Sequence, residues 1–230
     1  MNASFTGAVR TTVAGEELLL LPDRAVYWPS HATLLVADPH FGKAAAFRFA
    51  GLFVPPGTTA AALSRLSKLL VNTNAERIVF LGDFLHAAEG RSAQMFSAVA
   101  AWRRSHAAIG MTLVRGNHDR RAGDPPTELG IGVVDGPSVE GPFALAHHPA
   151  AVEGLYVLAG HIHPCVTVRG RGRGDRERLA CFWFGAQVGV LPAFGEFTGC
   201  AEISPKDGDR VWVVAGSEVI ANEGKSRRTG

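Results

Sequence analysis

Five short polar segments, each following a run of apolar residues, constrain the fold of this chain more than any other feature. The segments are Asp38-Pro39-His40, Gly82-Asp83, Gly116-Asn117-His118-Asp119, His147-His148-Pro149 and Gly160-His161-Ile162-His163. The apolar runs before them are 33–37, 78–81, 111–114, 143–146 and 155–159. Such runs, ended by glycine or a polar residue, are typical of strands covered on both faces. In open α/β sheets ligands bind beyond the carboxyl ends of the strands, so these segments are expected to meet at one rim.

The residue types in these segments are those of a centre that holds two divalent ions. Two ions about 3.5–4 Å apart clamp a phosphoryl group and supply a hydroxide for in-line attack. Holding them that close requires a bridging carboxylate, and we expect Asp83 to offer one oxygen to each ion. Mixed nitrogen and oxygen ligands favour Mn, with Fe or Zn as alternatives, over Mg or Ca, which prefer shells of oxygen.

The order of the five segments resembles the signature of the calcineurin-like metallophosphoesterase superfamily. That signature is an Asp-x-His, a Gly-Asp, a Gly-Asn-His-Asp or -Glu, a His, and a Gly-His-x-His. The resemblance implies a dinuclear, metal-dependent phosphoesterase that hydrolyses phosphodiesters. It implies that Asp83 is shared between two ligand sets, which are Asp38, His40 and His163 on the first ion and Asn117, His147 and His161 on the second.

Some of the residues that adjoin these ligands are expected to take part in catalysis, and for others a structural role is the alternative. The resemblance makes His118 the proton donor to the leaving oxygen, which suits an imidazole because its pKa lies near working pH. Asp119 is expected to hold the His118 ring and to favour its charged form. His148 either contacts substrate or metal, or packs or hydrogen-bonds beside the site. His86 is either a residue behind the ligands or an ordinary loop residue.

A longer stretch around the first two segments resembles one bacterial subgroup. The matching residues are 38–48 (DPHFGKAAAFR), Gly51, 54–59, 82–86 and 145–149. The subgroup is the ligase-associated phosphoesterases, often called DNA-damage-response endonucleases, and Pro39 replaces the Leu that is more usual there. This resemblance implies cleavage of DNA during repair, alongside an ATP-dependent DNA ligase and a helicase-like protein. The candidate substrate contacts are Lys43, Arg48, Arg120 and His148, with ordinary surface charge as the alternative for the cations.

Two other functions remain open at this level. The same two-metal centre serves a small-molecule phosphodiesterase or phosphatase acting on nucleotides or cyclic nucleotides. A deep closed pocket favours that substrate, and an open basic groove favours DNA. The third hypothesis is a non-catalytic scaffold with this fold, and the complete ligand set argues against it.

The order of the predicted elements indicates an α/β fold. The 230 residues, 47% of them hydrophobic, fit one domain over 1–221, with 222–230 as a disordered tail. A hairpin at 16–28 and helices at 58–72 and 92–108 are expected in the first half. Further strands are expected at 129–134, 143–146, 155–159, 166–168, 178–184, 199–203 and 210–214. This order is compatible with the four-layer sandwich of the superfamily, which has two mixed β-sheets packed face to face and helices outside.

Composition and cysteine usage bear on the compartment. Cys165, Cys181 and Cys200 have no paired spacing, so we expect three buried small apolar residues in a reducing compartment. The longest early apolar run, 18–21, is too short for a membrane span or a signal, which predicts a cytoplasmic protein without membrane contact. The Arg/Gly stretch 169–178 is either a solvated hairpin loop or a loop that contacts phosphate.

Overall fold

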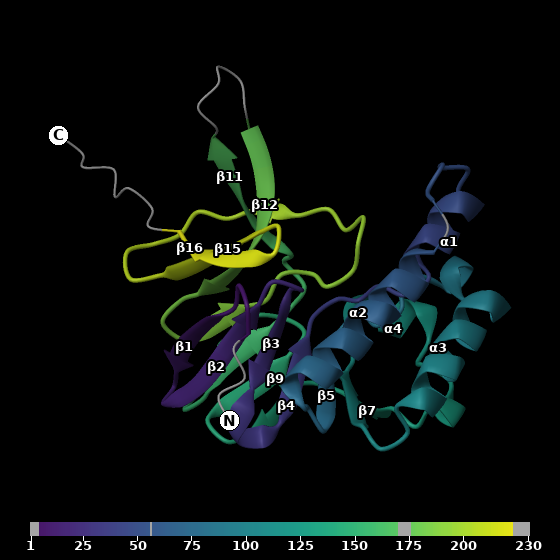
Figure 1. Cartoon of the computed structure of the whole chain (residues 1–230), viewed down its shortest axis with the longest axis horizontal. Helices are drawn as coiled ribbons and strands as arrows, with labels where there is room; N and C mark the ends of the chain where they lie inside the picture. Colours follow the sequence, from purple (N-terminus) through teal and green to yellow (C-terminus); the bar gives the residue numbers. More distant parts are fainter. Residues whose placement is uncertain (1–4, 56, 170–175, 223–230) are drawn as a thin grey trace.

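The structure is a computed structural model that describes residues 5–55, 57–169 and 176–222. The expected disordered tail (but for residue 222) and the middle of the Arg/Gly stretch lie outside these residues. The described part consists of two mixed β-sheets and a group of helices (Figure 1). None of the helices in the described ranges combines the length and the apolar character that a membrane span needs.

The first sheet has seven strands in the order of the sequence. They are β1 (Val9–Val13), β2 (Glu16–Leu21), β3 (Ala25–Trp28), β4 (Thr33–Val36), β5 (Arg77–Leu81), β6 (Gly110–Val114) and β7 (Gly132–Val134). The pairs up to β4 are antiparallel, and those from β4 to β7 are parallel. The predicted hairpin is β2–β3, and Arg24 closes its turn with a left-handed backbone (φ 64°).

The second sheet contains the strands from the latter half of the chain. Its order is β14 (Ala201–Glu202), β11 (Pro164–Arg169), β12 (Arg176–Phe184), β13 (Val188–Val190), β10 (Tyr156–Ala159), β9 (Phe143–Ala146) and β8 (Ser138–Glu140). Two further strands, β15 (Arg210–Ala215) and β16 (Glu218–Ala221), extend it from β12. Strands β9, β10 and β13 are parallel, so β9 and β10 end at the same edge.

The two sheets pack face to face, and helices cover the other face of the first sheet. The four consecutive leucines of 18–21 are all buried. Because strand residues alternate between faces, these leucines are buried alternately on the two faces of the sheet. Leu18 and Leu20 contact the second sheet, whereas Leu19 and Leu21 join the core under the helices. Trp28 meets Phe143 of the second sheet edge to face, with ring centroids 4.9 Å apart.

The helices connect the parallel strands of the first sheet. They are α1 (Lys43–Phe49), α2 (Thr58–Thr73), α3 (Ala93–Ser105) and α4 (Asn117–Ala122). The core beneath α2 and α3 contains the apolar residues that the sequence pattern places on one face of each helix. The structure thus confirms an α/β fold with two mixed sheets face to face and helices outside. In the described ranges the helices accompany the first sheet (Figure 1).

One expectation about the cysteines is wrong. Cys165 and Cys200 form a disulfide, with Cα atoms 5.7 Å apart and a sequence separation of 35 positions. They meet because β11 and β14 pair in parallel, a long-range contact that sequence spacing does not reveal. Cys181 is free and buried, as expected. The inference of a reducing compartment rested on free thiols, so it loses its support from Cys165 and Cys200.

Candidate metal centre

The five polar segments lie at the carboxyl ends of five strands, as the sequence predicts. Strands β4, β5 and β6 are parallel neighbours in the first sheet, and β9 and β10 are parallel neighbours in the second. Hydrogen bonds join the segments across the sheets. The backbone N–H of His161 donates to Asp38 (2.7 Å), and that of His118 donates to Asp83 (2.9 Å). All seven candidate metal ligands therefore meet at one rim.

The first group of candidate ligands is Asp38, His40 and His163. The Nε2 atoms of the two histidines are 3.4 Å apart, and His163 Nε2 is 3.4 Å from Asp38 Oδ2. His163 donates its Nδ1–H to the carbonyl of Gly199 at 3.1 Å, which leaves its Nε2 lone pair facing the group. Two imidazole nitrogens and a carboxylate oxygen that converge in this way can ligate a cation.

The second group is Asn117, His147 and His161. Nε2 of His147 is 2.8 Å from Asn117 Oδ1 and 3.1 Å from His161 Nδ1. His147 Nδ1 donates to the carbonyl of Leu81 at 3.2 Å, and its Nε2 faces Asn117 and His161. Burial alone would lower the pKa of His147, but the adjacent carboxylates of Asp38 and Asp83 raise it above its ordinary value. This group, like the first, has the donor atoms of a metal site.

Asp83 lies between the two groups. Its Oδ2 atom is 3.8 Å from His40 Nε2, and its Oδ1 atom is 3.5 Å from His147 Nε2. Each carboxylate oxygen thus faces a different set of ligands. This is the arrangement that a carboxylate shared by two ions requires.

The electrostatics of the group also fit divalent cations. Burial raises the pKa of Asp83 to about 6, and the nearby Asp38 charge adds to the shift. Burial lowers the pKa of His40 to about 2. Burial alone would raise the pKa of Asp38, but the adjacent rings of His147 and His163 bring it well below its usual range. Asp38 Oδ1 is fully buried and has no hydrogen-bond partner among the described residues, although His147 Nδ1 is 3.4 Å away.

Backbone strain is concentrated at the same residues. Five candidate ligands have left-handed backbone angles, which are Asp38 (φ 50°), His40 (47°), Asp83 (45°), His161 (71°) and His163 (52°). Each such residue costs on the order of 1–3 kcal/mol and persists only where the surrounding structure enforces it. Here the buried strands before each segment do so. Strain gathered on one set of polar side chains indicates a functional site.

Three of the five motifs contain a glycine, and each of these glycines leaves room for a candidate ligand. A Cβ would lie 1.9 Å from His147 Nδ1 at Gly82, 2.2 Å from Asp83 Oδ1 at Gly116 and 2.5 Å from Asp38 Oδ2 at Gly160. These distances are far inside van der Waals contact. The glycines in the sequence signature are therefore required by the packing of the ligands against the neighbouring backbone.

Gly160 offers a direct test of that packing, because its φ is not in the left-handed region and only the added methyl group matters. A Cβ there would also lie 2.8 Å from the carbonyl oxygen of Leu81. We expect Gly160→Ala to displace Asp38, to lower bound metal and to reduce turnover about 10²-fold, the effect of a misplacement of about 1 Å. Elemental analysis and hydrolysis of bis-p-nitrophenyl phosphate measure both. Gly132→Ala is the control, since its Cβ would meet nothing closer than 3.7 Å; equal metal content in the two variants would contradict the expectation.

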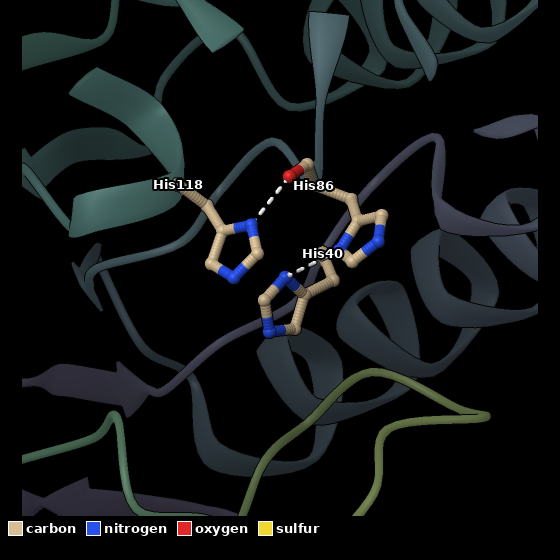
Figure 2. A group of neighbouring side chains, drawn as sticks. All are labelled: His40, His86 and His118. Atoms are coloured by element: carbon tan, nitrogen blue, oxygen red, sulfur yellow. Dashed lines mark hydrogen bonds between the residues drawn. The ribbon is translucent and has the colours of Figure 1, made fainter. Parts of the chain in front are cut away.

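His118 lies between the ligand His40, whose ring centroid is 5.0 Å from its own, and His86 (Figure 2). Its Nδ1–H donates to the carbonyl oxygen of His86 at 2.6 Å, and its Nε2 atom is 3.9 Å from Asp83 Oδ2. The hydrogen bond to His86 fixes the ring so that Nε2 faces the centre. Nε2 is therefore the atom able to exchange a proton with a bound substrate.

Asp119 does not hold the His118 ring, and that expectation is wrong. Its carboxylate is fully buried and accepts hydrogen bonds from the backbone N–H groups of Leu85 and Gly116, both at 2.9 Å. Burial raises its pKa. Successive residues of α4 point about 100° apart, which directs Asp119 inward when His118 faces the centre. Asp119 instead ties the segment after Asp83 to the start of α4.

His86 belongs to the site, although sequence reasoning left it between two possibilities. Its ring stacks on His118 (centroids 5.0 Å apart, 19° between planes), and its Nδ1 is 3.3 Å from Nδ1 of His40 (Figure 2). Burial lowers the pKa of His86 to about 4, so the ring is neutral at pH 7. The sequence signal for His86 was its position three residues after Asp83, inside the stretch 82–86 that resembles the bacterial subgroup.

The four candidate substrate contacts lie at different distances from the centre. The Lys43 ammonium is half-buried close to Asp83 and Asp38, and burial lowers its pKa against their opposing effect. His148 is exposed, and its ring centroid is 4.2 Å from that of His161. The remaining two contact the protein elsewhere, since Arg48 donates to Val54 O (3.3 Å) and Arg120 pairs with Asp135 (2.8 Å).

Two packed sheets whose strand ends gather Asp, Asn and His ligands around a shared carboxylate define a metallophosphoesterase. Among solved structures, the chain is similar to a nuclease MPE of Pseudomonas putida, with 44% identity and a TM-score of 0.84. The match covers 94% of this chain and 100% of that one. The chain belongs to the metallophosphoesterase superfamily, in the family of that nuclease. It is a metal-dependent phosphoesterase that binds divalent metal.

Other comparisons add little. A protein of unknown function, AQ665 from Aquifex aeolicus, is 19% identical over 57% of this chain and 78% of its own. The phosphoesterase Yfce from E. coli is 15% identical over 82% of this chain and 96% of its own. Both have a TM-score of 0.41, too low to support an argument. No family model matches the chain, and the comparison with curated proteins finds no match.

Proposed function

We propose that this protein is a dinuclear phosphodiesterase that cleaves DNA. The observation that carries the dinuclear centre is the position of Asp83, whose two oxygens face two separate ligand groups. The two ions would be held by Asp83 together with Asp38, His40 and His163 on one side and Asn117, His147 and His161 on the other. Nucleic acid as substrate is supported by 44% identity to a nuclease over nearly the whole chain.

The metal is proposed from the chemistry of the ligands. Each group mixes imidazole nitrogen with carboxylate or amide oxygen, which suits Mn, Fe or Zn better than Mg or Ca. Mn is the metal that we propose, with Fe or Zn as alternatives. When bound, two such ions supply an activated water and neutralise the charge on the phosphoryl oxygens. A role in DNA repair beside a DNA ligase and a helicase-like protein stays a prediction of the family resemblance.

The side chains of the site have distinct tasks in the proposed reaction. His118 carries the proton on Nε2 and gives it to the leaving oxygen, while the His86 carbonyl keeps Nδ1 occupied and the ring in place. Lys43 contributes positive charge close to Asp83 and Asp38. His148, exposed next to His161, lies where a phosphate oxygen or a leaving group passes.

Residues beside the centre line two hollows of different size. The hollow between His40, Lys43 and Phe197 has a volume of about 10 Å³, and one lined by Pro149 and Ile162, next to candidate ligands, measures about 440 Å³. Pockets that enclose small ligands measure about 300–1,000 Å³. The preference for DNA over a nucleotide therefore rests on the similarity to the nuclease.

The test compares two substrates on one metal-stripped sample. Mn, Fe or Zn is added back, and hydrolysis of bis-p-nitrophenyl phosphate is measured beside cleavage of a labelled single-stranded oligonucleotide. We expect Mn to restore both activities. Hydrolysis of the small ester alone would contradict DNA as the substrate and favour a nucleotide. A protein that binds metal yet hydrolyses neither substrate would support the scaffold hypothesis instead.

A further inference from the structure

Exposed aromatic side chains lie beside the metal centre and at the far end of the helix that begins next to it. Phe49 is 79% exposed, Phe53 is 95% exposed and Phe197 is 53% exposed. Burying such rings is normally favourable, so rings left in solvent indicate a surface that another molecule covers. In the described residues the other strongly exposed large hydrophobic side chains are aliphatic, namely Leu52, Val71, Val139, Val168 and Ile220. Exposed phenylalanine is thus confined to the two segments described next.

The first segment is the end of α1 and the turn after it. Helix α1 begins three residues after His40, and its seven residues span about 10 Å. Near the middle of the helix, Phe47 contacts the His86 ring edge to face, with centroids 5.7 Å apart. Phe49 and Phe53 follow, at the outer end of α1, which stands at the edge of the molecule (Figure 1). They therefore lie about one helix length from the centre.

Phe197 forms the second segment. It lines the same shallow hollow as His40 and Lys43. Its backbone is left-handed (φ 57°), an unfavourable conformation for an aromatic residue. Phe197 thus borders the rim where Lys43 meets the candidate ligands, and Phe49 and Phe53 lie farther out, at the end of α1 and in the turn after it.

The charges around these rings select the kind of partner. From residue 39 to residue 75 the chain has no Asp or Glu and four cations, which are Lys43, Arg48, Arg65 and Lys68. The acid next to Phe197, Glu196, lies 3.7 Å from Arg65, so these two charges offset each other and the positive charge of the segment comes from Lys43, Arg48 and Lys68. A surface with exposed rings, positive charge and no free acid in this segment complements a polyanion that also carries flat apolar groups. Single-stranded nucleic acid has both, because its bases are unpaired.

We propose that Phe49, Phe53 and Phe197 form a platform on which unpaired bases of a single-stranded nucleic acid stack while one phosphodiester lies at the metal centre. This inference rests on the proposed function and specifies its substrate. Lys43 and Arg48 contact the phosphates between the stacked bases. Bases in a duplex are already stacked and paired, so the platform favours single strands over duplex.

The experiment measures the KM for a labelled single-stranded oligonucleotide relative to the KM for bis-p-nitrophenyl phosphate. Each lost base–ring stack weakens binding about 5- to 150-fold, so Phe49→Ala and Phe53→Ala should raise this ratio by an amount in that range. Phe53→Trp should keep the ratio, whereas Phe53→Leu, which is apolar but has no ring, should not. Val71→Ala is the matched control, because Val71 is 73% exposed on α2 and lies outside the platform.

The outcomes separate the platform from the proposed function. A wild-type protein that hydrolyses the small ester but leaves the oligonucleotide intact overturns both. Normal cleavage by the wild type with an unchanged ratio in Phe49→Ala and Phe53→Ala overturns the platform alone. So does a Phe53→Leu variant that behaves like the wild type, since plain apolar contact would then suffice. A dimer that Phe53→Ala dissociates, with the ratio unchanged, would show that a second copy covers these rings.

Discussion

Asp83→Asn is expected to abolish binding of both metal ions and all phosphodiesterase activity. The variant keeps the shape of the side chain and an oxygen that can accept from the backbone N–H of His118. It removes the negative charge that faces both ligand groups, within 3.8 Å of His40 and 3.5 Å of His147. Elemental analysis after metal reconstitution measures the loss. Asp207→Asn, which removes one exposed charge, is the matched control and should bind metal normally.

The pH dependence of the same residue gives an independent check. Burial raises the pKa of Asp83 to about 6 in the metal-free protein, above its value in the unfolded chain. Below the unfolded value both states are protonated and the shift has no effect, whereas above about pH 6 the folded state carries a buried charge that destabilises it. Metal-free Asp83→Asn should therefore melt at or above the temperature of the metal-free wild type at pH 7. With Mn added, the order should reverse, because only the wild type gains binding energy.

Acid relieves the buried charge of Asp83 in the metal-free protein, but it weakens metal binding. A metal ligand must be deprotonated, so protonation of Asp83 competes with metal. Affinity of the wild type for Mn should fall as the pH drops through about 6. If Asp83→Asn bound two ions per chain, or if it melted below the metal-free wild type at pH 7, Asp83 would not be the carboxylate that two ions share.

The strands of the metal centre were predictable because they obey local rules. Apolar runs such as 78–81 and 143–146 are buried on both faces, so their pattern reports their environment directly. Edge strands carry no such signal, and β1, β8 and β16 were not foreseen. The internal strand β13 was also missed, because it is only three residues long. Helix α4 was also missed, because it is only six residues long and begins within the motif itself.

The contacts that were not predictable depend on tertiary geometry. Asp119 follows His118 directly, which suggested a pair, but the helical turn of α4 separates the two side chains. The Cys165–Cys200 disulfide depends on the pairing of β11 with β14. The partner of the His118 ring is a backbone carbonyl, and a carbonyl is present at every residue, so no residue type could have marked it.

His118→Ala is expected to leave metal binding near normal and to lower kcat about 10²–10⁴-fold, the usual range for loss of a general acid. Metal should stay, because the hydrogen bond to Asp83 comes from the backbone N–H of residue 118, which the substitution preserves. The loss should be large for an oligonucleotide, whose leaving alkoxide needs a proton. It should be small for bis-p-nitrophenyl phosphate, because nitrophenolate leaves without one.

The split between the two leaving groups is what distinguishes a proton donor from a residue that only supports the fold. A purely structural role would lower both activities together, and a metal ligand would lower the metal content as well. His106→Ala is the control, since its ring packs on Trp102 at the end of α3, outside the five motifs. The geometry requires the split, because Nδ1 of His118 is held by the His86 carbonyl and only Nε2 faces the centre. Equal losses on both substrates would therefore assign the proton transfer to another group, of which His148 is the nearest exposed candidate beside His161.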